Sequence, residues 1–229
     1  GNLARYPMHW HMAGDVTGQY LRNSSVWRTF SRCVTVHGSD NAAVQDNVCY
    51  DHTGHGYFLE DGGETGNLIE GNLGLTSRVP QGADRLLASD ATPATFWITN
   101  PDNTIRDNVA AGSAGFGFWC AFPESPTGLS TGQPDLPRTT PLREFSGNVA
   151  HSNHNGGLFV DDGPRPDGTT EVTNYEPRAV PSDPNSAPVQ ADFTGFRAYK
   201  HYFRAVWLRG TYLRLSHALL ADNAIGATF

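Results

Sequence analysis

Apolar and polar positions along this chain follow a repeat. The repeat occurs in three stretches. Each contains an apolar residue, a polar pair ending in Asn, a short apolar run and then a Gly nine residues after the Asn. The Asn and Gly positions are 47 and 56, 108 and 117, and 148 and 157. Each unit supplies strands of four or five residues, and the Gly, Asn, Asp and Ser residues between them allow tight bends. One such unit cannot bury its own apolar face, but stacked units can. The pattern therefore predicts a solenoid of stacked strands.

The fold class that this repeat favours is all-β, as a right-handed parallel β-helix formed by a single domain over residues 1–229. Hairpin dipeptides are scarce, and the count within each unit is constant while the spacers vary. Both features disfavour the alternative, an antiparallel sandwich of evenly spaced strands. The recurring Asn47, Asn108 and Asn148 are expected to form a ladder, with each side-chain amide bonding the backbone of the next turn.

Long loops interrupt the repeat. Residues 120–143 and 163–190 are rich in Pro, and residues 76–96 form a further polar segment. The two Pro-rich excursions are too long to be plain connections in a compact domain. They leave the repeat just after Trp119 and just after Asp161 and Asp162, so we expect them to lie on one flank of the stack and to wall a groove.

Composition narrows the partners of this protein. The formal net charge of −7 disfavours nucleic acid and anionic membranes as partners, and no apolar run reaches the roughly 18 residues of a membrane span. The first residues contain no apolar signal-peptide core and no initiator Met, and the chain ends within a repeat, so we expect a fragment of a longer protein. Cys33, Cys49 and Cys120 cannot all pair, and their apolar surroundings favour buried free thiols.

Charged residues recur at one position of the repeat. Counted from Val26, Val48, Val149 and Ala198, the tenth residue onward is apolar, and the residues that follow are His37, Glu60 with Asp61, Asp161 with Asp162, and Arg209. A parallel solenoid brings equal positions of successive turns to one edge, so a cluster of carboxylates with a His and an Arg is expected there. The alternative is a purely structural role, in which the Asp-Gly pairs only form turns.

Such a cluster suits cleavage of a glycosidic bond. One carboxylic acid protonates the leaving oxygen, and a second carboxylate activates water or attacks the anomeric carbon. The catalytic candidates are Glu60, Asp61, Asp161 and Asp162, with His37 and His55 as orienting or proton-carrying groups. The substrate-binding candidates are Arg32 and Arg209 for uronate carboxylates, Trp97, Trp119 and Trp207 for stacking on sugar rings, and His151.

Metal binding is a minority interpretation. His9 and His11 would share one face of a strand with Trp10 opposite, and Asp15 follows, but the sequence shows no third ligand at a recognisable spacing. The sequence requires no cofactor, although clustered carboxylates leave Ca²⁺ as an alternative.

Several segments resemble one known family. The sequence is similar to the β-helix region of the cell-migration-inducing, hyaluronan-degrading proteins and the related transmembrane hyaluronidases. The matching segments are YPMHWHMAGD at 6–15, FSRCVTVHG at 30–38, GHGYFLEDG at 54–62, TFWITNP at 95–101, AAGS at 110–113, GFW at 117–119, NVAHSN at 148–153 and WLRG at 207–210. The resemblance implies a right-handed parallel β-helix, hyaluronan or a related glycosaminoglycan as ligand, and an extracellular or cell-surface setting.

The sequence thus predicts a polysaccharide-degrading domain, a glycosidase that hydrolyses a uronate-containing glycan. Two alternatives stay open. A β-elimination lyase would leave an unsaturated uronate, and a glycan-binding or adhesive module would bind without cleaving.

Overall fold

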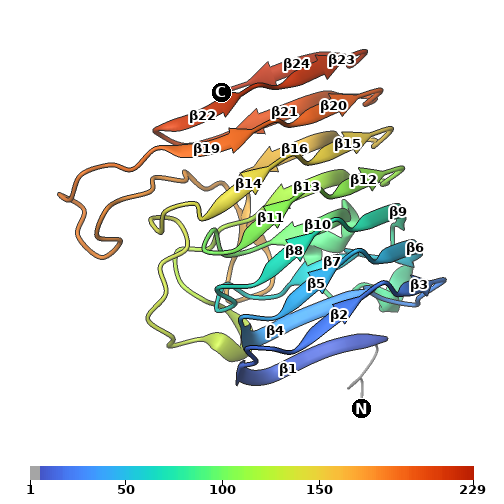
Figure 1. Ribbon diagram of the computed structural model, residues 1–229, viewed down its shortest axis with the longest axis horizontal. Helices are drawn as coiled ribbons and strands as arrows, with labels where there is room; N and C mark the ends of the chain where they lie inside the picture. Colours follow the sequence, from blue (N-terminus) through green and yellow to red (C-terminus); the bar gives the residue numbers. More distant parts are fainter. Residues whose placement is uncertain (1–5) are drawn as a thin grey trace.

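The computed structural model describes residues 6–229, and it is a stack of coils that rises from β1 to β24 (Figure 1). The segment 1–5, on which the expectation about a signal peptide partly rested, lies outside the described residues. Each coil adds one strand to each of three sheets, and neighbouring strands in these sheets pair in parallel. The prediction of a parallel β-helix is therefore confirmed, and the antiparallel sandwich is excluded.

We call the three parallel sheets A, B and C. Sheet A contains β1 (Met8–Asp15), β4 (Val34–Asp40), β7 (Tyr57–Leu59), β10 (Ala94–Ile98), β13 (Phe116–Cys120), β16 (Gly156–Val160), β21 (Arg204–Leu208) and β24 (Ile225–Thr228). Sheet B contains β2 (Tyr20–Arg22), β5 (Ala43–Gln45), β8 (Leu68–Glu70), β11 (Thr104–Arg106), β14 (Glu144–Ser146), β19 (Ala191–Thr194) and β22 (Leu213–Ser216). Sheet C contains β3 (Ser25–Trp27), β6 (Val48–Thr53), β9 (Leu73–Arg78), β12 (Val109–Ala111), β15 (Val149–His151), β20 (Arg197–Tyr199) and β23 (Leu219–Ala221).

Three long loops flank sheet A. Loop 79–93 carries the 3₁₀ helices η1 (Gly82–Asp84) and η2 (Ala88–Ala91) and leads from sheet C into β10. Loop 121–143 carries η3 (Gly128–Ser130), and loop 161–190 carries the antiparallel pair β17 (Gly163–Pro164) and β18 (Thr170–Glu171). The last two both leave sheet A toward sheet B, and they project from the same side of the stack in Figure 1. The expectation of Pro-rich loops on one flank is confirmed.

An asparagine ladder runs through the corner between sheets B and C. Asn47, Asn72, Asn108 and Asn148 occupy successive coils, and the Oδ1 of each later Asn accepts a hydrogen bond from the backbone N–H of the preceding Asn at 3.0–3.1 Å. The side-chain amide of each preceding Asn also donates to that oxygen. The ladder is as expected, except that each side chain bonds the backbone of the preceding turn. It satisfies buried groups that would otherwise be unpaired.

Sheet A is apolar on both faces. Inside the stack, the rings of Tyr57, Phe96 and Phe118 lie 4.7 Å apart from centroid to centroid, which matches the spacing of about 4.8 Å between strands. Outside the stack, Phe58, Trp97 and the aromatic side chains of later coils form a second buried cluster. A sheet with two buried faces is rigid, so it can hold the side chains at its edge in fixed positions.

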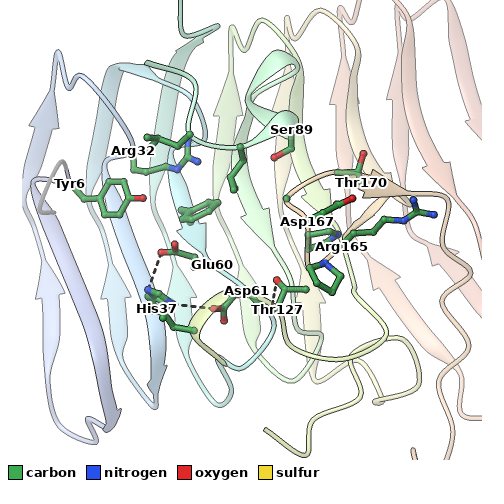
Figure 2. A pocket seen from close by; sticks show the side chains of 18 of the residues that line it. Tyr6, Arg32, His37, Glu60, Asp61, Ser89, Thr127, Arg165, Asp167 and Thr170 are labelled. Carbon is green, nitrogen blue, oxygen red and sulfur yellow. Dashed lines mark hydrogen bonds and ion pairs between the residues drawn. The ribbon is translucent and has the colours of Figure 1, made fainter. Parts of the chain in front are cut away.

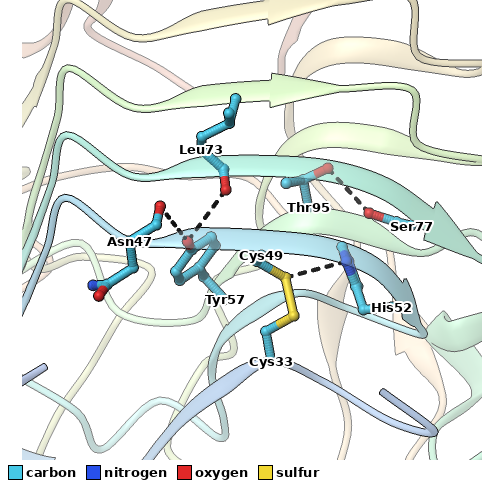
Figure 3. Close-up of a disulfide and its surroundings, with 8 residues drawn as sticks. All are labelled: Cys33, Asn47, Cys49, His52, Tyr57, Leu73, Ser77 and Thr95. Atoms are coloured by element: carbon cyan, nitrogen blue, oxygen red, sulfur yellow. Dashed lines mark hydrogen bonds between the residues drawn. A yellow bond between two sulfur atoms is a disulfide. The ribbon is translucent and has the colours of Figure 1, made fainter. Parts of the chain in front are cut away.

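The cysteines differ from the expectation. Cys33 and Cys49 form a buried disulfide with a Cα–Cα distance of 5.9 Å (Figure 3). Cys120 is a buried free thiol. The expectation of free thiols was wrong for the first pair, because the sequence alone does not show that consecutive coils place the two side chains opposite each other. His52 lies beside the disulfide, with 3.1 Å between its Nδ1 and the Cys49 sulfur. The paired sulfurs are not available as thiolate ligands for a metal ion.

Among residues 6–229, no helix is long and apolar enough to cross a membrane.

Candidate active site

Strand register on sheet A decides which polar side chains meet. His11 pairs with His37, and Val36 pairs with Leu59. The next residues along these two strands, His37 and Glu60, therefore lie side by side on the outer face of sheet A. The register count from the sequence was wrong by one position here, because it aligned Val36 with Phe58. Thr35 is the residue that pairs with Phe58. The correction brings His37 and Glu60 into direct alignment.

A cavity of about 530 Å³ lies over these strands. Its floor includes His37, Glu60 and Asp61, and all three long loops contribute to its walls (Figure 2). Arg165 and Asp167 lie across the cavity from His37 in Figure 2. The loops thus enclose part of the outer face of sheet A and form a pocket of the size typical for ligand sites.

His37 bridges two carboxylates on the pocket floor. Its Nε2 lies 3.0 Å from Oδ2 of Asp61, and its Nδ1 lies 3.3 Å from Oε2 of Glu60. The Asp61 side chain is 5 % exposed and is further held by the backbone N–H of Ser130. The Glu60 side chain is 23 % exposed, although its Oε2 is itself buried against Nδ1 of His37. Glu60 is therefore the carboxylate most available to a ligand.

The charges of this group depend on one another. Burial opposes protonation of His37, but the hydrogen bond to Asp61 and the charges of Glu60 and Asp61 outweigh burial and raise the pKa of His37. Burial alone would raise the pKa of Asp61, yet its hydrogen bonds to His37 and Ser130 lower it. Burial raises the pKa of Glu60, against the opposing charge of His37. The floor of the pocket thus combines an ionised Asp61 with a Glu60 that takes up a proton more readily than usual.

Glu64 belongs to this group although sequence reasoning missed it. It is fully buried, and its carboxylate accepts hydrogen bonds from the backbone N–H groups of Gly38, Asp61 and Gly62. Burial and the nearby charge of Asp61 raise the pKa of Glu64 to about 8. Glu64 fixes the backbone on both sides of the His37–Asp61 contact. An acidic residue shortly after a Glu-Asp-Gly-Gly run was the only signal in the sequence.

The first strand adds two more imidazoles. His9 and His11 lie on one face of β1, with ring centroids 4.9 Å apart, and Trp10 packs against the core on the other face as expected. His37 is near both, at 6.1 Å from His9 and 5.1 Å from His11. Asp15, the third residue proposed with this pair, instead accepts hydrogen bonds from Thr17 and Asn41, so it lies outside this group.

Arg32 and His55 form the buried support of the pocket. Arg32 is 1 % exposed and makes a two-pronged ion pair with Asp90 of loop 79–93, at 2.5 and 3.3 Å. His55 accepts a hydrogen bond from the backbone N–H of Ala94 and contacts Ser89 at 3.0 Å. Burial and the charge of Arg32 lower the pKa of His55 to about 3, so the imidazole is neutral. Both side chains hold loop 79–93, and Arg32 is already paired within the protein.

Asp161, Asp162 and Arg209 lie in a separate cluster. Along sheet A, β7 and β16 are three strand spacings apart, or roughly 14 Å at about 4.8 Å each. That exceeds the separation of about 5–9.5 Å between the carboxyl groups of glycosidase pairs, so Glu60 and Asp161 do not form such a pair. Asp161 accepts four hydrogen bonds, from the side chains of Trp207 and Arg209 and from the backbone N–H groups of residues 162 and 173. Its lone pairs are used to anchor loop 161–190.

The aromatic candidates are mostly inside the protein. Trp97 is fully buried and Trp119 is 3 % exposed, so the expectation of exposed rings is wrong for both. Trp207 is partly exposed, with the guanidinium groups of Arg204 and Arg209 near its ring. His151 lies on sheet C and stacks on Tyr199, so it is not part of the pocket. The long loops cover the middle of sheet A, and the sequence did not reveal where they fold back.

Two exposed charged side chains of the pocket were not singled out from the sequence. Arg165 and Asp167 come from loop 161–190, between β17 and β18. Hydrogen bonds from Thr169 lower the pKa of Asp167, so this carboxylate is ionised at neutral pH. The Pro-Arg-Pro-Asp-Gly run marked a turn but gave no sign that the turn lies over the His37 group.

Comparison with known proteins agrees with this architecture. The family model described as CEMIP beta-helix matches residues 2–158. The chain belongs to the CEMIP beta-helix family. The matched residues include β1, β4 and β7, which carry the His37 group of the candidate site.

Relatives of this CEMIP beta-helix chain align over nearly all of it. The human cell migration-inducing and hyaluronan-binding protein is 35% identical over 99% of the chain, which corresponds to 20% of that relative. The human cell surface hyaluronidase CEMIP2 is 33% identical over 99% of the chain and 19% of its own length. Human Fibrocystin-L is 33% identical over 96% of the chain and 5% of its own length. The chain thus spans about a fifth or less of these relatives.

Proposed function

We propose that this chain forms the polysaccharide-binding and cleaving face of a glycosidase, which hydrolyses hyaluronan or a related uronate-containing glycan. The observation that carries the proposal is the walled pocket, on whose floor the partly exposed carboxyl group of Glu60 lies beside His37 and Asp61. The names of two relatives supply the substrate class, because one is called a cell surface hyaluronidase and another a hyaluronan-binding protein.

In this proposal Glu60 exchanges a proton with the glycosidic oxygen. Asp61 orients His37 through the 3.0 Å contact, and His37 keeps the Glu60 side chain directed into the pocket. Asp167 is our candidate for the second carboxylate, since among the described residues that line the pocket only Glu60, Asp61 and Asp167 carry one. Arg165 donates from Nε to Glu171 at 2.9 Å, and the remaining N–H groups of its half-exposed guanidinium pair with a uronate carboxylate of the glycan.

We place this activity outside the cell or at its surface. The Cys33–Cys49 disulfide supports this setting, because such bonds persist in oxidising compartments. Two relatives carry names that refer to the cell surface.

The test is to incubate the purified chain with hyaluronan and to follow polymer length by size exclusion together with ultraviolet absorbance. Shortened chains without new absorbance support hydrolysis, whereas shortened chains that absorb identify a β-elimination lyase. Hyaluronan that is bound but keeps its length refutes cleavage by this chain and identifies a binding module.

Glu60→Gln tests the residue assignment. We expect cleavage to fall at least about a hundredfold, the scale on which positioned acid–base groups contribute. The matched control is Glu144→Gln, which changes a partly exposed carboxylate on sheet B and should leave activity unchanged. A folded Glu60→Gln variant with full activity would refute the role of Glu60.

A further inference from the structure

The three imidazoles at the start of the stack have the arrangement of metal ligands. One nitrogen from each of His9, His11 and His37 lies within 4.8 Å of the others. Three nitrogens around a Zn²⁺ ion at about 2.0–2.1 Å lie about 3.3 Å apart, so side-chain rotations that move the nitrogens closer by up to about 1.5 Å close the site. We propose that His9, His11 and His37 bind a divalent transition-metal ion of the Zn²⁺ type.

Strand pairing between β1 and β4 places the three histidines together. His9 and His11 alternate onto one face of β1, and strand pairing sets His37 directly beside His11. These residues are therefore held by hydrogen-bonded strands and not by a flexible loop. Within the described residues, Nε2 of His9 is buried and has no hydrogen-bond partner, which is costly unless a ligand engages it.

The surroundings of His37 match those of metal-binding histidines. A ligating imidazole commonly donates its second ring N–H to a carboxylate, which fixes the ring. Asp61 provides that carboxylate, 3.0 Å from Nε2 of His37, so Nδ1 is the ligating nitrogen and the metal ion replaces its contact with Glu60. His11 is exposed and lines the same cavity as Glu60. The ion thus has three protein ligands and an open position toward the pocket, as in catalytic metal sites.

The ligand set selects the kind of ion. Imidazole nitrogens suit Zn²⁺ and similar transition metals, whereas Ca²⁺ takes six to eight oxygen ligands. A Ca²⁺ ion would find nitrogens where it requires oxygens. The inference does not depend on the proposed hydrolase activity, because metal binding is measured without a glycan.

The experiment is isothermal titration of the untagged chain, stripped with chelator, with Zn²⁺ and separately with Ca²⁺. We expect one Zn²⁺ per chain with a dissociation constant in the micromolar range or below, and much weaker Ca²⁺ binding. His11→Ala should weaken Zn²⁺ binding at least tenfold. Because His11 is exposed, this variant should stay folded. The matched control His154→Ala, which also removes an exposed histidine, should bind like the wild type.

Replacement of Zn²⁺ by Co²⁺ gives a second readout, since four-coordinate Co²⁺ with nitrogen ligands absorbs strongly in the visible range and should do so only with His11 present. Equal Zn²⁺ binding by the wild type and His11→Ala, no Zn²⁺ binding, or tighter binding of Ca²⁺ than of Zn²⁺ would overturn the proposal. A chain that binds Zn²⁺ but leaves hyaluronan intact would refute the hydrolase and keep the metal site.

Discussion

Replacement of Asp90 by Asn is expected to destabilise the protein strongly. Asp90 and Arg32 are each 1 % exposed, and their ion pair ties loop 79–93 to the coil that carries the candidate site. Oδ2 of Asp90, which also accepts the longer of the two Arg32 hydrogen bonds, accepts hydrogen bonds from the backbone N–H groups of Leu86 and Leu87. Asn keeps the shape and one acceptor oxygen but removes the charge, so the guanidinium stays buried without an anion.

The size of the effect follows from that burial. Removal of one partner of a buried ion pair costs about 3–5 kcal/mol, and we expect the lower end because the Asn side-chain oxygen can still accept a backbone hydrogen bond. For a domain of 150–250 residues each kcal/mol lowers Tm by about 2–4 °C, so a Tm decrease of roughly 6–12 °C is expected. The assay is thermal and urea unfolding followed by circular dichroism.

Two variants make this reasoning refutable. The matched control is Asp192→Asn, which removes the anion of the exposed Arg214–Asp192 pair, whose side chains are 54% and 39% exposed, and should cost at most about 1 kcal/mol. Arg32→Met added to Asp90→Asn should recover part of the loss, because it removes the uncompensated cation. If Asp90→Asn costs no more than Asp192→Asn, or if Arg32→Met deepens the loss, the buried charge is not the cause.

Three further predictions concern the same scaffold. Replacement of Cys33 and Cys49 together by Ala should lower the free energy of unfolding by about 3 kcal/mol, as expected for a bridge across 16 residues, and an unchanged urea midpoint would contradict this. Asn108→Ala should cost about 2–4 kcal/mol, because it leaves buried partners of the ladder unpaired, while Asn185→Ala in an exposed loop should cost almost nothing. Burial opposes ionisation of Asp90, but Arg32 and His55 lower its pKa below 3.8. The stability that ionised Asp90 provides is therefore complete above about pH 4 and lost as the pH falls through its folded-state pKa. The difference in free energy of unfolding between wild type and Asp90→Asn should shrink over that acid range, and a difference that persists would contradict this.

Sequence reasoning predicted the site in part. Alternation on a strand is local, so the shared face of His9 and His11 could be read directly, and the equivalence of coil positions suggested that His37 and Glu60 approach each other. The burial of Trp97 and the partners of Asp161 could not be read, because both depend on loops that fold back over sheet A from distant parts of the chain. Asp167 and Arg165 enter the pocket for the same reason.

The sequence by itself determined the solenoid, since the repeat of short apolar runs and Asn residues can bury its apolar faces only by stacking. It also determined the ladder of Asn47, Asn108 and Asn148, because each coil repeats the same corner. Only the tertiary structure decided which charges meet. The three strand spacings between Glu60 and Asp161 separate two carboxylates that look equivalent in sequence, and the stacking of β1 on β4 supplies His37 as the third imidazole beside His9 and His11. Contacts between coils depend on register and loop length together, and neither is fixed by a local pattern of residues.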